Sequence, residues 1–135
     1  MKSNKFLLIM AAVLGASSVL IGAFAAHALK AHLSVQALGW IETGVQYQQF
    51  HSLAILILAF AIKLWPTWPG LDKAAYSFIM GILLFSGSLY FMALTDIRSL
   101  ALLTPLGGLV FLIGWGILIW SATGADTDFG KQDDR

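Results

Sequence analysis

The chain has no cysteine and few charged residues: of its 135 residues, 11% are Asp, Glu, Lys or Arg. The absence of cysteine excludes disulfides, thiolate catalysis, iron–sulfur clusters and zinc–thiolate sites. Soluble domains carry about 25% charged residues, so this chain has too few to cover a core with a hydrated surface. Apolar residues make up 59% of the chain, and the mean hydropathy is +0.81. The sequence therefore predicts a membrane protein whose main partner is the lipid bilayer.

Other absences exclude whole classes of function. The net charge is +1 and the basic residues are scattered singly, so no basic patch is present and no nucleic-acid partner is expected. The apolar runs contain no Asp or Glu, whereas proton-coupled multidrug exporters need an intramembrane carboxylate. An HExxH motif and an intramembrane aspartate pair are also missing, which argues against proteolysis. We expect a protein that is not an enzyme and holds no metal or cofactor.

Four apolar runs are each close to the length that crosses about 30 Å of hydrocarbon: residues 6–28, 45–64, 74–94 and 99–120. They predict an all-α fold, an integral membrane four-helix bundle forming one transmembrane domain over residues 1–123. The first run follows Lys2 and Lys5 and ends in small residues, as a cleaved signal peptide does. It is longer than the signal-peptide apolar core of about 7–15 residues, which favours a span. The acidic tail, residues 124–135, is expected to be disordered.

The connections between the runs carry their own signals. In residues 29–44, apolar residues recur at near-helical spacing and predict a short amphipathic helix lying flat at the interface between helices 1 and 2. Residues 65–70 contain two Pro and two Trp, which predicts an interfacial hairpin with Asp72 as the next N-cap. Thr104 and Pro105 suit a cap and a first helical position, so the regular fourth helix is expected to begin at Pro105.

Small residues recur along three of the four runs. Lipid tails are as apolar as leucine, so close approach of small residues contributes much of the association between membrane helices. Tight packing is our interpretation of these positions, and a backbone opened for a ligand is the alternative. Whether they pack the bundle or a second copy in a homo-oligomer stays open. The packing candidates are Gly15, Ser18, Gly22, Gly81, Ser88, Gly107, Gly108 and Gly114.

A polar cluster is predicted from the first two runs. His27 ends the first run and His51 lies near the start of the second, so the two are expected to meet at similar depth if the helices are adjacent. Tyr47 and His51, like Gln48 and Ser52, are four residues apart and share one side of a helix. We favour hydrogen bonds between helices that set the bundle's register. A small-ligand or lipid-headgroup site, and a metal or haem site with axial histidines, remain as alternatives.

These features lead to two hypotheses for function. The first is a non-enzymatic integral membrane protein with a structural, assembly or envelope-maintenance role. The second is a small-solute channel or carrier, lined by Tyr47, Gln48, His51 and Ser52, or a protein that binds haem or a lipid headgroup there. No acid, base and nucleophile set can be assembled from these residues, so no catalytic residue is expected.

Four motifs occur in order along the chain: GAFAAHAL (22–29), QYQ followed by FH (46–51), FSGSLY (85–90) and TPLGG (104–108). Together they resemble the YgdD/YwdK-type family of small bacterial inner-membrane proteins, whose domain is one of unknown function. The likeness reaches to about residue 120, with Ala25 and Asp96 where that family more often has glycine. The resemblance implies a four-helix protein of the bacterial cytoplasmic (inner) membrane. It assigns no catalytic residue, substrate or cofactor to this chain.

The basic residues also predict an orientation. With four spans, both termini and the loop between the second and third spans share one side. That side carries six of the eight Lys and Arg residues, and the other side carries Lys30 and Arg98. Short cytoplasmic loops are enriched in Lys and Arg, so both termini are expected to be cytoplasmic.

Overall fold

The computed structural model describes residues 2–124 of the chain, which are almost entirely helical. The elements in order are α1 (Lys2–His27), the 3-10 helix η1 (Leu29–Ala31), α2 (Val35–Leu64), α3 (Leu71–Thr95), the 3-10 helix η2 (Arg98–Leu102) and α4 (Leu103–Gly124). The four α-helices are each long and apolar enough to cross a membrane. The predicted all-α, four-span architecture is confirmed. Residues 125–135 of the tail predicted to be disordered lie outside the described residues.

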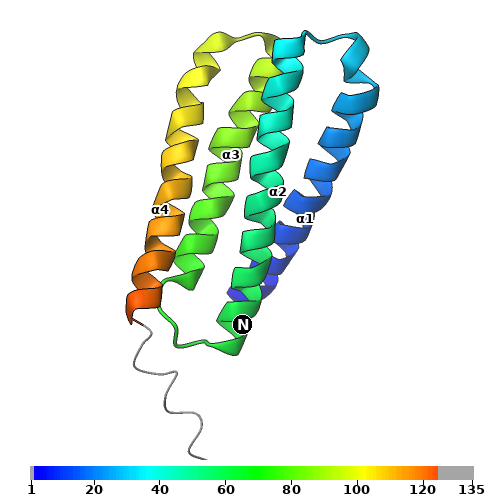
Figure 1. Cartoon of the computed structure of the whole chain (residues 1–135). Coiled ribbons are helices and arrows are strands. Elements are labelled where there is room, and N and C mark those ends of the chain that lie inside the picture. Colours follow the sequence, from blue (N-terminus) through cyan, green and yellow to red (C-terminus); the bar gives the residue numbers. More distant parts are fainter. Residues whose placement is uncertain (1, 125–135) are drawn as a thin grey trace, which may run out of the picture.

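The helices run antiparallel to their neighbours and pack in the order of the sequence: α1 against α2, α2 against α3, and α3 against α4. Figure 1 shows α1 and α4 on opposite sides of the central pair α2 and α3. The N-terminus, the α2–α3 turn and the end of α4 lie at one end of the molecule. The helices η1 and η2 lie at the other, which we call the η end.

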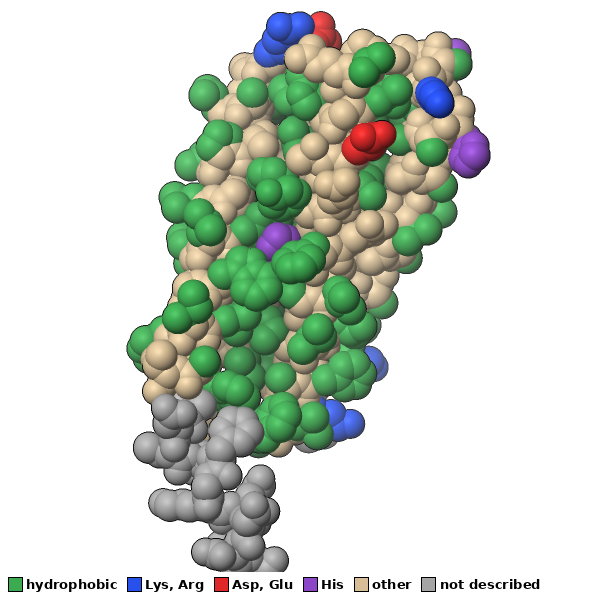
Figure 2. Space-filling model, viewed as in Figure 1, with side chains coloured by type: hydrophobic (Ala, Val, Ile, Leu, Met, Phe, Trp, Pro, Cys, Tyr) green, Lys and Arg blue, Asp and Glu red, His purple; other side chains and the backbone are tan. Residues whose placement is uncertain are grey.

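The surface matches a lipid environment. Figure 2 shows hydrophobic side chains over the flanks of the helices, with charged side chains gathered toward the two ends. Large apolar side chains are more than half exposed on every helix, for example Val19, Ile57, Leu83 and Ile119. Such a surface is stable against hydrocarbon and would aggregate in water. The chain is therefore a multi-pass membrane protein.

Helix α2 is 30 residues long and begins earlier than the sequence predicted. The Ser34 hydroxyl caps it by accepting a hydrogen bond from the backbone N–H of Ala37. The predicted flat amphipathic helix over residues 29–44 is wrong: η1 covers residues 29–31, and residues 35–44 form the first turns of α2. Their apolar stripe, which includes Ala37 and Ile41, is buried against neighbouring helices rather than on the membrane surface. At about 45 Å, α2 exceeds the hydrocarbon thickness of about 30 Å.

The turns are close to those predicted, with local differences. Residues 65–70 connect α2 to α3, as the two prolines indicate. The N-cap of α3 is Gly70 at φ +82, not Asp72, because the turn needs a left-handed residue there. Asp72 lies in the first turn instead, where a carboxylate is favoured by the helix dipole. Helix α4 begins at Leu103, so Pro105 is its third residue rather than its first.

Several of the small residues singled out in the sequence lie where helices approach closely. A Cβ added at Gly81 or Gly114 would collide with the ring of Phe111 or Phe78, and at Gly107 with the backbone of Phe85. These three glycines set the distance between α3 and α4. Of the remaining candidates, Ser18 and Ser88 are buried. A Cβ added at Gly22 would lie 3.4 Å from the Val45 side chain, one added at Gly108 would lie 3.9 Å from the Phe85 ring, and one added at Gly15 would have no neighbour within 4 Å.

Candidate functional site

Gln48 joins three helices in the centre of the molecule. Its side chain is 3% exposed. The amide nitrogen donates to the carbonyl of Leu14, at 2.8 Å, and to the hydroxyl of Ser17, at 2.8 Å, both on α1. The amide oxygen accepts a hydrogen bond from the Tyr90 hydroxyl of α3, also at 2.8 Å. Gln48 of α2 therefore has partners on both neighbouring helices.

Serine hydroxyls make further links between helices. Ser86 of α3 donates to the carbonyl of Gly44 on α2, at 2.7 Å. Ser77 of α3 donates to the carbonyl of Val110 on α4, at 2.7 Å. The hydroxyls of Ser88 and Thr104 share a hydrogen bond between α3 and α4. Together with Gln48, these bonds tie every sequential pair of helices.

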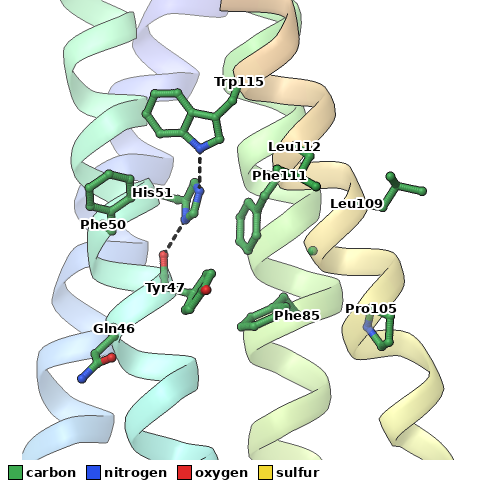
Figure 3. Close-up of a pocket in the computed structure, with 11 residues that line it drawn as sticks. Gln46, Tyr47, Phe50, His51, Phe85, Pro105, Leu109, Phe111, Leu112 and Trp115 are labelled. Carbon is green, nitrogen blue, oxygen red and sulfur yellow. Dashed lines mark hydrogen bonds between the residues drawn. The ribbon is translucent and has the colours of Figure 1, made fainter.

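His51 lies one turn beyond Gln48 and has partners at both ring nitrogens. Nδ1 is 2.8 Å from the carbonyl oxygen of Tyr47, and the indole N–H of Trp115 on α4 donates to Nε2 at 3.2 Å. An indole nitrogen can only donate, so Nε2 accepts and the proton is assigned to Nδ1. The imidazole is thus held neutral, and its ring stacks on Phe111 with centroids 3.6 Å apart. Figure 3 shows both hydrogen bonds.

This arrangement bears on the alternatives for the histidines. A haem or metal ligand needs a free nitrogen lone pair. The lone pair of His51 Nε2 accepts from Trp115, and Nδ1 donates to the backbone. The residues therefore do not fit an axial ligand set in this conformation.

His27 does not join the cluster, contrary to expectation. It is exposed at the end of α1, while Gln48 lies beside Leu14. The 13 residues between Leu14 and His27 correspond to about 20 Å along α1, which puts His51 at least that far from His27. The physical reason is the early start of α2 at Val35, because it moves His51 from the second turn of the helix to the fifth.

The other predicted members lie on two different faces of α2. Gln48 and Ser52 are buried, each 3% exposed, with the Ser52 hydroxyl bonded to the carbonyl of Gln48. Tyr47 and His51 line a groove on the side of α4. The four side chains therefore do not line one cavity.

We call this hollow the α2–α4 groove. It has a volume of about 850 Å³, and α3 forms its floor between α2 and α4. Five aromatic rings line it: Tyr47, Phe50, Phe85, Phe111 and Trp115. Its other lining residues are Gln46, His51, Pro105, Gly108, Leu109 and Leu112. The volume is within the range of about 300–1,000 Å³ of small-molecule sites.

Reasoning from sequence did not identify the hydrogen-bonding roles of Trp115, Tyr90, Ser77 and Ser86. Trp115 carried a usable signal: it lies in the middle of an apolar run, although tryptophan favours the membrane interface, and a buried indole N–H needs a partner. Ser77 and Ser86 are as small as the other packing candidates, and their helical spacing did not distinguish a hydroxyl that bonds from one that only packs.

Comparison with known proteins agrees with this architecture. The model of the family described as "Protein of unknown function (DUF423)" matches residues 21–108. The "UPF0382 inner membrane protein YgdD" of Escherichia coli (strain K12) is 44% identical over 124 residues, which cover 89% of this chain and 91% of that relative.

Relatives from other bacteria are also similar over most of their length. A "UPF0382 membrane protein" of Haemophilus influenzae is 44% identical over 83% of this chain and 88% of its own length. A relative from Staphylococcus haemolyticus is 39% identical over 87% of this chain and 94% of its own length. No solved structure matches the chain. The family match and these identities, over nearly the whole length, show that the chain belongs to the DUF423 family and is a homologue of the YgdD-type inner-membrane proteins.

Proposed function

We propose that this protein is a non-enzymatic component of the bacterial inner membrane with a structural, assembly or envelope-maintenance role. The observation that carries the proposal is the use of both His51 nitrogens within the chain, by Tyr47 and Trp115. A general acid or base must direct a nitrogen at its substrate, and His51 directs neither outward. Gln48 is equally engaged, with α1 and α3. The polar side chains thus serve the helix packing.

The membrane and the orientation belong to the same proposal. The E. coli relative is named an inner membrane protein, and we assign this chain to the same membrane. The distribution of Lys and Arg supports cytoplasmic termini, which puts the η end on the outer side. Complementary reporters fused to either terminus test this orientation, because a periplasmic signal from both ends would contradict cytoplasmic termini.

The channel alternative finds less support. It needs Tyr47, Gln48, His51 and Ser52 along one hydrated lining, but Gln48 and Ser52 face away from the groove and are buried. Cysteine scanning of residues 46–52 is clean because the chain has no cysteine of its own. We expect no reaction at positions 48, 51 and 52 with a membrane-impermeant thiol reagent. Reaction at all three would favour a channel.

The non-enzymatic proposal is tested on the purified protein. We expect no visible absorption band in wild type, and a lower midpoint of thermal unfolding in His51→Ala, because that variant leaves the Trp115 indole without its acceptor. The matched control is Gln49→Ala, one helix position beyond Gln48 and exposed. A haem band that disappears in His51→Ala would overturn the proposal.

A further inference from the structure

The α2–α4 groove is not explained by helix packing. Its rims are apolar and exposed: Phe50 is 59% exposed on α2, and Leu109 and Leu112 are 55% and 67% exposed on α4. These rims belong to membrane-spanning helices, so their surroundings are hydrocarbon. The groove therefore opens sideways into the lipid, and what fills it comes from the membrane.

The groove covers only one half of the membrane thickness. It runs from Pro105 and Gln46, toward the η end, to Trp115 and His51 near the middle of α4 and α2. The ten residues from Pro105 to Trp115 correspond to about 15 Å of helix, half of a hydrocarbon core of about 30 Å. Its length is that of one lipid leaflet.

The inner limit of the groove is formed by the polar pair already described. Trp115 reaches from α4 to His51 on α2 and hydrogen-bonds to it across the groove, as Figure 3 shows. His51 is held there by its stack on Phe111 and its bond to the Tyr47 carbonyl. The wall is thus fixed by contacts with Trp115, Phe111 and Tyr47, and it lies near the middle of α2 and α4. At the opposite limit lies Pro105, the third residue of α4, close to the η end.

We infer that the α2–α4 groove is a binding site for one acyl tail of a glycerophospholipid from the leaflet at the η end. The tail lies along the five aromatic rings, its terminal methyl against the Trp115–His51 pair and its ester region at the level of Pro105. The match between an apolar groove of one-leaflet length and a tail of one-leaflet length selects this occupant. A transmembrane helix of a second copy needs a groove across both leaflets, and the Trp115 wall prevents that. The inference does not depend on whether the protein is an enzyme.

The test uses the full chain in vesicles of phosphatidylethanolamine and phosphatidylglycerol. The probe is a phosphatidylethanolamine with a photoreactive diazirine at the end of one acyl chain, and the adducts are located by peptide mass spectrometry. We expect several-fold more adduct at Trp115 than at Val13. Val13 is 55% exposed on α1, next to Leu14 and so at nearly the depth of His51, and it reports ordinary surrounding lipid. Equal yields at the two positions would overturn the inference.

A matched pair of variants tests whether the groove causes the excess of adduct at Trp115. In Gly108→Trp the new side chain starts 3.9 Å from the Phe85 ring, an ordinary contact, and fills the groove. In Gly116→Trp the same side chain is added two turns along α4, outside the groove, where an added Cβ has no neighbour within 4 Å. We expect Gly108→Trp to reduce the adduct at Trp115 to the level of Val13. Gly116→Trp should keep the wild-type excess.

The remaining outcomes also decide the question. Unchanged labelling of Trp115 in a folded Gly108→Trp protein would contradict the site. A cross-link from Trp115 to a second copy of the chain, lost in Gly108→Trp, would replace the lipid tail by a protein partner. If Gly108→Trp shows no cooperative thermal unfolding, Leu112→Trp fills the groove from its exposed rim and gives the same readout.

Discussion

Two faces of α2 carry similar polar side chains but have different surroundings. On the face toward α1, Gln48 is enclosed and hydrogen-bonded to two helices. On the face toward α4, Tyr47 and His51 border a groove that opens to lipid. The difference lies in the neighbouring helix, because α1 packs directly on α2 whereas α4 is held off by α3. The same kind of residue thus closes an interface on one side and shapes a site on the other.

Removing the side-chain amide of Gln48, on the face of α2 toward α1, should have the largest effect on the free energy of unfolding. Gln48→Ala removes the hydrogen bonds to the Leu14 carbonyl, the Ser17 hydroxyl and the Tyr90 hydroxyl, and it opens a cavity between three helices. We expect the free energy of unfolding to fall by about 3 kcal/mol, since membrane hydrogen bonds contribute roughly 1–2 kcal/mol and the cavity adds to this. Unfolding in detergent mixtures measures it. A loss no greater than that of Gln49→Ala would contradict the role of Gln48 in joining the three helices.

On the face of α2 toward α4, a smaller effect on stability is expected, and it arises from one pair of side chains. The variants His51→Phe and Trp115→Phe, alone and together, form a double-mutant cycle across the groove. Because one hydrogen bond of 3.2 Å joins the two side chains, we expect a coupling energy of about 1 kcal/mol. Each single variant should leave the closed face intact, with the Gln48 contacts unchanged. If the changes in the free energy of unfolding of the two variants are strictly additive, Trp115 and His51 do not interact across the groove.

The smallest effect on stability is expected at Asp96, which lies on neither of these two faces of α2. Asp96 is a non-glycine residue with φ +56, and it ends α3 in the left-handed conformation that glycine adopts without cost. Its ion pair with Arg98 is exposed and contributes little. Asp96→Gly should therefore raise the free energy of unfolding by about 0.5 kcal/mol. Asp96→Ala is the control, and it should destabilise the protein; equal effects of the two variants would show that backbone strain is not involved.

The accuracy of the sequence-based predictions varied with the range of the interactions involved. The four spans and the 65–70 turn follow from hydrophobic length and from proline, and both are confirmed. The start of α2 was missed because an amphipathic segment is stable either on a membrane surface or against another helix, and Ala25 and Ala93 decide the matter here. The proposed meeting of His27 and His51 failed for the same reason, since it relied on that boundary.

The candidate site was also predicted only in part. Gln48 and His51 were recognised because polar residues in an apolar run are costly unless they have partners. The identity of those partners was not accessible, because Leu14, Tyr90 and Trp115 lie 34, 42 and 64 positions away in the sequence. The groove could not be predicted from the sequence, because its existence depends on how far apart α3 holds α2 and α4.

Hydrophobic length and composition alone determine that this protein crosses a membrane with four helices, because transfer of about 20 apolar residues into hydrocarbon is a local property of each segment. Tertiary structure alone decides that Gln48 is enclosed while His51 and Trp115 wall a groove. Lipid provides no hydrophobic force to choose between helix neighbours, so the choice depends on small residues such as Gly107 and Gly114, which set how closely α3 and α4 approach.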